Sequence, residues 1–191
     1  MARRIHSQGE ETRQSILAAA SRLFVENGVG STSLKDIARE AQISPGTLFY
    51  YYSSKSELIF EVTDQHFDRV TRQLLDWART SDLQADPAAI LEVVLKTIVG
   101  DQVRGKLHHY LIEAALSSDA AVRERFLQKY REWRAMIEDG IAPFVADDEQ
   151  RRIAALIFLS TLDGLVMQAI LGVEELPLEK IADRFAGGML N

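Results

Sequence analysis

The segment SPGTLFYYYSSKSEL, residues 44–58, combines hydroxyl groups, four consecutive aromatic side chains and one lysine. In a helix, Leu48 and Tyr52 share one face because they are four residues apart. The side chains that point away from this face are those of Thr47, Tyr50 and Tyr51. A tyrosine outside a core presents a flat ring and a hydroxyl, which suit a thymine methyl group, a sugar or a phosphate oxygen. This chemistry favours noncovalent recognition of a nucleic acid; the alternative is that the aromatic block is a packing seam between this part of the chain and the rest.

Two short helices and a turn must hold this segment. Ser33 as an N-cap and Asp36 three residues later predict a helix over 33–41. Pro45 fits the first turn of the next helix, because it fixes φ and lacks a donor that a helix start does not use. Residues 42–44 are then a tight turn, and the two helices form a helix-turn-helix whose second helix fits the major groove of DNA.

Further helices are predicted on both sides of this motif. Apolar residues at helical spacing predict a helix over 11–26 that ends at a left-handed cap, Asn27-Gly28. Ser54 with Glu57 three residues later predicts a capping box, with Lys55 in the first turn of the helix. Helix N-termini and lysines both favour phosphate.

The stretches ENGVGSTSLKDIAREA and QISPGTLFYYYSSKSELI closely resemble the DNA-binding domain of the TetR/AcrR family of bacterial repressors. The resemblance covers residues 10–62 and agrees in helix order, turn, glycine, aromatic cluster and lysine together. It implies operator contacts by residues around the turn, in the third helix and at the start of the fourth. By position these are Thr32, Ser33, Ser44, Gly46, Thr47, Tyr50, Tyr51 and Lys55. Phe49 and Tyr52 are expected to pack inward.

The charge is unevenly distributed along the chain. The net charge is −6, but residues 1–55 hold seven Lys/Arg against five Asp/Glu, while residues 56–191 hold 15 against 23. A mildly basic end on an acidic remainder is expected where only that end faces phosphate, although a local excess of two charges also arises by chance.

The composition indicates an ordinary soluble protein. No long apolar run suited to spanning a bilayer and no secretory h-region is recognisable, which favours a cytoplasmic location and no membrane partner. The absence of cysteine excludes disulfides, thiolate metal sites and cysteine nucleophiles. No cofactor and no metal site is expected, because His108 and His109 are adjacent and diverge around a helix.

The rest of the chain is predicted to be helical. Segments over 54–80, 87–102, 104–117, 119–142, 147–171 and 177–189 are split by Asp86-Pro87, Gly105, Ala142-Pro143 and Leu176-Pro177. The predicted fold is all-α with about nine helices. An N-terminal helix-turn-helix DNA-binding domain, residues 1–55, precedes a helical ligand-binding and dimerisation domain, residues 56–191.

Aromatic and histidine side chains are candidates for an effector pocket in the second domain, because pockets in helical bundles are aromatic with few polar groups. The candidates are His66, Phe67, Trp77, His108, Tyr110 and Trp133. The segment RERFLQKYREWRAMIE also interleaves cations with aromatics, but helical spacing and offsetting glutamates favour a solvated helix face over a nucleic-acid site.

The penultimate helix is apolar on nearly all sides, which indicates burial on more than one side. The family resemblance implies dimerisation through the last two helices as a four-helix bundle; a core within one subunit is the alternative. The candidates for the interface are Leu156, Leu159, Gly164, Leu165, Val166, Ile181 and Phe185.

These features together predict a homodimeric transcriptional repressor that binds a palindromic operator in double-stranded DNA and is released by a small-molecule effector. Two alternatives stay open. One is an all-α enzyme with a tyrosine-lined cleft, which is disfavoured because no nucleophile and base are recognisable. The other is an architectural DNA-binding protein that responds to no effector.

Overall fold

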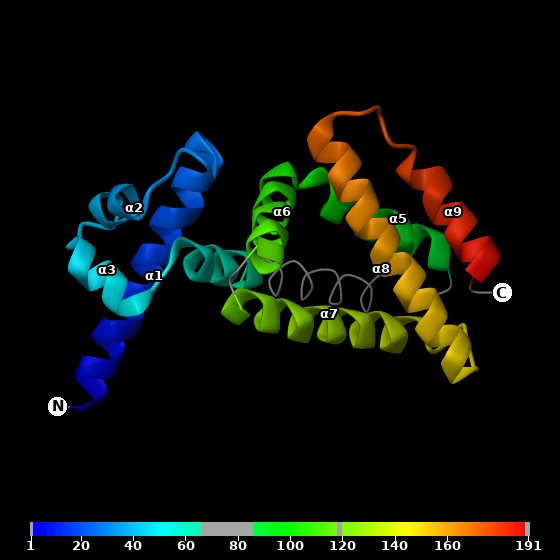
Figure 1. The fold of residues 1–191 in the computed structure, drawn as a ribbon. Coiled ribbons are helices and arrows are strands. Elements are labelled where there is room, and N and C mark those ends of the chain that lie inside the picture. The colour runs from blue at the N-terminus through cyan, green and yellow to red at the C-terminus, as the bar shows by residue number, and fades with distance from the viewer. Residues whose placement is uncertain (1, 66–85, 118–119, 190–191) are drawn as a thin grey trace. The chain divides into compact units, whose positions relative to one another are not determined.

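The structure, a computed structural model, describes residues 2–65, 86–117 and 120–189, and every regular element within them is a helix (Figure 1). The helices with both ends described are α1 (Ala2–Asn27), α2 (Leu34–Glu40), α3 (Pro45–Tyr51), α5 (Pro87–Gly100), α6 (Gln102–Ser117), α7 (Ala120–Ile141), α8 (Asp148–Leu171) and α9 (Leu178–Met189). A further helix over 55–65 follows α3. The all-α prediction is confirmed.

The chain forms two compact units. Unit 1 comprises residues 1–68 and 106–122, and unit 2 comprises residues 69–105 and 123–191. The boundary therefore falls inside α6 and, a second time, inside the first turn of α7. The functional division expected at residue 55 stays a prediction, but the compact unit that contains the helix-turn-helix extends beyond it.

Unit 1 is held together by apolar side chains from its first helices. The buried residues are Ile16, Leu17, Ala19, Ala20 and Phe24 from α1, Ile37 and Ala38 from α2, Leu48 and Tyr52 from the α3 region, and Leu58, Ile59, Phe60 and Val62 from the helix over 55–65. Each fully buried Leu, Ile or Phe contributes about 1.5–3 kcal/mol. This core fixes α2 and α3 relative to α1.

Left-handed residues end α1 and α2. Gly28 follows α1 with φ 78°, as the Asn27-Gly28 signal predicts, although α1 begins at Ala2 rather than at residue 11. After α2, Gln42 takes φ 57°. The N–H of Ile43 donates to the carbonyl of Ala38 over 3.0 Å, and the N–H of Gln42 to that of Arg39 over 3.1 Å. This is a Schellman motif in which glutamine occupies the position that usually holds glycine.

The core of unit 2 is built from α5, α8 and α9, and Figure 1 shows α8 and α9 joined by a short loop. Its buried residues are Leu95, Val99, Phe158, Leu162, Leu165 and Ala182. The rings of Phe158 and Phe185 meet edge to face at 5.3 Å. The last helix, α9, packs mainly along α5 and meets the middle of α8 through the Phe158–Phe185 pair.

Gly105 lies inside α6, so the prediction that it separates two helices is wrong. A Cβ atom at this position would lie 2.9 Å from Ile170 Cγ2 and 3.0 Å from Val166 Cγ1 of α8. Glycine is needed here because it lets α6 and α8 approach closely.

One helix of the described residues, α8, is long and apolar enough to cross a membrane by length and composition alone. This corrects the expectation that no segment of the chain meets that criterion. Only 28% of the most apolar 18-residue stretch of this helix is buried within the protein. The apolar surface of α8 thus exceeds what its own core covers.

Candidate nucleic-acid interface

Helix α3 is fixed at its start by a serine cap. Ser44 Oγ accepts a hydrogen bond from the Thr47 N–H over 3.0 Å and lies 2.8 Å from Thr47 Oγ1, and Pro45 occupies the first turn. The inner face of the helix carries Leu48 and, at its end, Tyr52, which is only 2% exposed. The prediction that Tyr52 packs inward is confirmed. Burial raises the pKa of its hydroxyl above the ordinary tyrosine value.

The outer face of α3 presents aromatic surface. Tyr50 is 85% exposed and Phe49 is 52% exposed, so the expectation that Phe49 packs inward is wrong. The reason is that Phe49 follows the buried Leu48 by one residue and is therefore rotated by about 100° around the helix. The sequence-based prediction placed Phe49 on the inner face, whereas helical geometry places it on the exposed face beside Tyr50.

Tyr51 is held partly inward. Its ring meets that of Tyr50 edge to face at 5.3 Å. Its hydroxyl oxygen lies 3.7 Å from where a Cβ of Gly9 in α1 would be. Among the three tyrosines of this segment, Tyr50 therefore offers the most surface to a ligand, Tyr51 is half-buried and Tyr52 belongs to the core.

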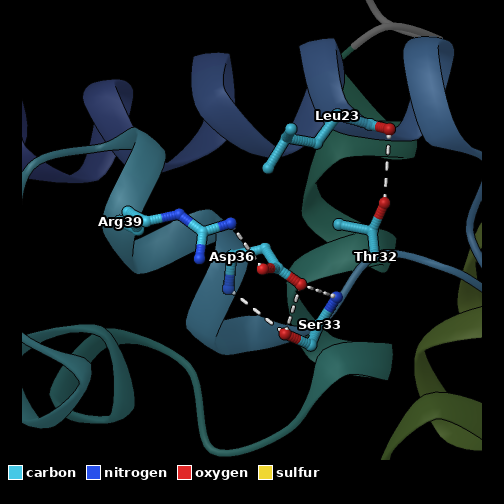
Figure 2. A network of polar contacts seen from close by, with 5 residues as sticks. All are labelled: Leu23, Thr32, Ser33, Asp36 and Arg39. Carbon is cyan, nitrogen blue, oxygen red and sulfur yellow. Dashed lines mark hydrogen bonds and ion pairs between the residues drawn. The ribbon is translucent and has the colours of Figure 1, made fainter.

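The start of α2 carries a complete capping network (Figure 2). Ser33 Oγ accepts from the Asp36 N–H over 3.2 Å, while Asp36 Oδ2 accepts from the Ser33 N–H over 3.1 Å and from the Ser33 hydroxyl over 2.5 Å. Arg39 Nη2 donates to Asp36 Oδ1 over 2.7 Å. The hydrogen bonds from Ser33, more than the charge of Arg39, hold the pKa of Asp36 below its usual value.

Thr32 has a structural part in this conformation. It is 2% exposed, and its hydroxyl donates to the carbonyl of Gly28 over 2.8 Å. The same hydroxyl donates to the carbonyl of Leu23 over 3.2 Å (Figure 2). Its N–H donates to the carbonyl of Val29. The side chain ties the loop before α2 to the end of α1, so its hydroxyl is not available for the operator contact that the resemblance implies. The neighbouring Ser33 is exposed.

The helix over 55–65 is capped by a pair of serines. Ser54 Oγ accepts from the Glu57 N–H over 3.1 Å, as the capping signal predicts. The return bond differs from the expected one, because the Glu57 carboxylate accepts from the N–H of Ser53 over 2.8 Å rather than from that of Ser54. Lys55, in the first turn, is half-buried.

Lys55 is engaged within unit 1. Its Nζ donates to the backbone carbonyl of Val29 and lies 5.7 Å from the centre of the Tyr110 ring. Burial lowers the pKa of Lys55. The remaining predicted DNA-contact residues, Ser44 and Gly46, are exposed, and Thr47 is half-buried.

The predicted pocket residues are only partly described. His66, Phe67 and Trp77 lie outside the described residues. His108 and Tyr110 lie in unit 1, whereas Trp133 lies in unit 2. There the Trp133 ring is 5.1 Å from that of Tyr130, whose hydroxyl donates to Asp163 over 2.9 Å. Burial is the main cause that raises the pKa of the Tyr130 hydroxyl, and the charge of the nearby Asp163 carboxylate is the second cause. Within the described part of the chain, no group of three acidic or histidine side chains is placed to hold a metal ion.

The predicted interface residues of α8 and α9 fall on two different faces. Leu156 and Gly164 are exposed, and Leu159 is half-buried. Leu165, in contrast, is 6% exposed within the core of its own subunit, so it is not available to a second subunit. The half-buried residues that pack against the same core are Val166, Ile181 and Phe185. Ile153 and Ile157, which sequence reasoning omitted, are exposed beside Leu156.

Helix α3 is fixed by its cap, presents an exposed aromatic face and rests on a core shared with α1 and α2. These features define a helix-turn-helix protein that binds DNA. Residues 16–62 match the model of the family described as "Bacterial regulatory proteins, tetR family". This stretch is a DNA-binding domain of the TetR family of transcription regulators. This is not a family of enzymes, so the all-α enzyme alternative is set aside.

Known proteins of similar sequence and fold are regulators. The chain is 26% identical over 201 residues to the HTH-type transcriptional regulator AcrR of Shigella flexneri, covering 100% of this chain and 93% of that one. It is 32% identical over 107 residues to the probable acrEF/envCD operon repressor of Escherichia coli K12, covering 56% of this chain and 47% of that one. A TetR transcription regulator structure from Haloarcula marismortui aligns with a TM-score of 0.73 at 22% identity, over 95% and 100% of the two chains.

Proposed function

We propose that this protein is a cytoplasmic, dimeric repressor that binds a palindromic operator through α3 and is released by a small molecule bound in residues 56–191. The observation that carries the proposal is the two-sided α3 helix. Leu48 and Tyr52 anchor its inner face, so Phe49 and Tyr50 project on a rigid support.

The exposed side chains of α3 suit the major groove. The rings of Phe49 and Tyr50 can contact thymine methyl groups, and the hydroxyls of Tyr50 and Thr47 can bond base edges or phosphates. Ser33, at the exposed start of α2, and Lys55 would contact the DNA backbone. Backbone contacts position the protein, and the α3 contacts select the sequence.

A second copy of the chain is the proposed occupant of the exposed face of α8. Ile153, Leu156 and Ile157 are each at least 40% exposed, and the exposed Gly164 continues the same stripe. Glycine at this position would let two helices approach closely. Dimerisation is typical of the TetR family, and a two-fold dimer matches a palindrome with half-sites about one DNA turn apart.

Repression and release by an effector are supported by a similar protein, by the TetR family and by the surroundings of Trp133. The Escherichia coli relative is described as an operon repressor. A small-molecule effector is typical of the TetR family. Trp133, beside Tyr130 and Asp163 in unit 2, supplies aromatic surface next to a hydrogen-bonding pair, which is the usual composition of a ligand pocket.

The test begins with DNA selected from a random pool by the purified protein, followed by fluorescence anisotropy on the selected site. We expect a palindromic consensus and saturable binding that exceeds binding to scrambled DNA by at least about 10³-fold. Tyr50→Ala should weaken binding to the selected site by about 1–3 kcal/mol and binding to scrambled DNA by less. Leu116→Ala, at an exposed position of α6, is the matched control. Failure to select any consensus would refute the proposed function.

A further inference from the structure

Lys55 joins three separate segments of unit 1. It stands at the start of the helix over 55–65, its Nζ donates to the carbonyl of Val29 in the α1–α2 loop, and its ammonium lies over the ring of Tyr110 in α6. The distance from Nζ to the ring centre is 5.7 Å. The ammonium is therefore docked on the protein.

Two attractive contacts hold the ammonium in this docked position. The Val29 carbonyl takes one of its three N–H donors, and the face of the Tyr110 ring attracts the positive charge. The site is partly removed from water, and burial lowers the pKa of Lys55 accordingly. A DNA phosphate that takes up this ammonium has to draw it away from both partners.

We propose that Tyr110 is a positioning residue for Lys55: by holding the ammonium on the Val29 carbonyl it competes with DNA phosphate and so weakens operator binding. The inference rests on the proposed function, because it assumes that Lys55 contacts the DNA backbone. Tyr110 belongs to α6, outside the helix-turn-helix, and it is thus a residue remote in sequence that sets DNA affinity.

The contact has a specific energetic signature. A cation–π pair at a partly exposed site corresponds to about a two- to fivefold change in an equilibrium constant. Removing the ring should free the ammonium and raise operator affinity by this factor. A gain of affinity is a result that damage to the fold does not produce.

The experiment measures operator binding by anisotropy for Tyr110→Leu and Tyr110→Phe, with and without Lys55→Ala. Tyr110→Leu keeps apolar volume but lacks a π face, and it should bind about two- to fivefold more tightly. Tyr110→Phe keeps the ring and should restore wild-type affinity. In the Lys55→Ala background, Tyr110→Leu should change nothing, because the competing ammonium is gone. His109→Ala, on an exposed neighbouring position of α6, is the matched control.

A second measurement needs no DNA. Burial should keep the titration of the Lys55 ¹³Cε resonance in the free protein below the ordinary lysine value. Tyr110→Leu keeps the apolar volume but removes the attraction of the ring for the ammonium, so it should lower the Lys55 pKa further. The proposal is overturned if Tyr110→Leu leaves the Lys55 titration unchanged, if Tyr110→Leu fails to tighten binding, or if the gain survives without Lys55. A wild-type protein that selects no DNA sequence, yet shows the Lys55 titration, would refute the proposed function and leave the docking contact intact.

Discussion

Leu156 and Leu165 lie on opposite sides of α8. Nine residues separate them, which corresponds to half a turn of rotation, and Leu156 is 42% exposed while Leu165 belongs to the core of unit 2. The same substitution at the two positions should therefore have different effects. Leu156→Arg should give a folded monomer, because a charge on the exposed face prevents a second copy from docking. Leu165→Arg should unfold unit 2, because it buries an unpaired charge.

Light scattering after size exclusion, together with circular dichroism, checks this prediction. The wild-type protein should elute as a dimer, and the Leu156 variant as a helical monomer with weaker binding to a full palindrome. A folded dimer in the Leu156→Arg variant would place the interface elsewhere.

Gly105→Ala should destabilise unit 2. The added methyl group would lie 2.9 Å from Ile170 and 3.0 Å from Val166, so α6 and α8 would have to separate, at a cost of about 1–3 kcal/mol. Gly140→Ala in α7 is the matched control, because no atom lies within 4 Å of its Cβ position. Urea unfolding of both variants checks the prediction. Equal stability of the two variants would contradict a close approach at Gly105.

Gln42→Gly should stabilise unit 1 by about 0.5–1 kcal/mol, because it relieves a left-handed backbone at a residue that carries a Cβ. Gln42→Ala retains the Cβ and the strain, and it should give no comparable gain. The thermal midpoints of the two variants provide the measurement. If alanine stabilised as much as glycine, the backbone conformation would not be the cause.

Acid should weaken the cap of α2. The folded-state pKa of Asp36 lies below its usual value, so the stability that its carboxylate contributes is present above the unfolded pKa, about 3.9, and is lost as the pH falls through the folded pKa. Urea unfolding at decreasing pH should therefore show a larger loss for the wild type than for Asp36→Asn. Ser33→Ala, which removes the main hydrogen-bond partner, should abolish most of this difference. Parallel pH profiles for all three proteins would argue against the network.

Phe49→Ala should leave the thermal stability within about 0.5 kcal/mol of the wild type, because half of the ring is exposed. It should weaken binding to the selected operator by about 1–3 kcal/mol. Leu48→Ala, one residue earlier, should instead cost about 2–5 kcal/mol of stability, since Leu48 is fully buried. Thermal melts and anisotropy on the same samples separate the two effects. A large loss of stability in Phe49→Ala would indicate that the Phe49 ring packs in the core.

Local signals in the sequence were sufficient for most of the fold. The caps at Ser33 and Ser44 and the left-handed Gly28 act through bonds within a few residues, so their residue types alone predict them. The misassigned residues depend on distant partners. In the sequence Gly105 looks like a helix break, because the reason for a glycine there is its close contact with Val166 and Ile170 of α8, which are distant in sequence.

The candidate site divides in the same way. The exposed face of α3 follows from helical geometry, and applying that geometry strictly would have included Phe49. The burial of Thr32 depends on the carbonyls of Leu23 and Gly28, and the docking of Lys55 depends on Tyr110, which is 55 residues further along the chain. No periodicity or spacing near either residue encodes these contacts.

Unit 1 is assembled from two stretches of chain, residues 1–68 and residues 106–122, and the second stretch supplies the buried side chains of Leu107, Leu111 and Val122. This arrangement sets an order for biosynthesis. While the ribosome is still adding the intervening residues, the nascent helix-turn-helix lacks part of its own core. A gene fragment that stops at residue 68 would encode an incomplete unit with exposed apolar surface, whereas the DNA-binding part of the full polypeptide can mature only after translation has passed residue 122.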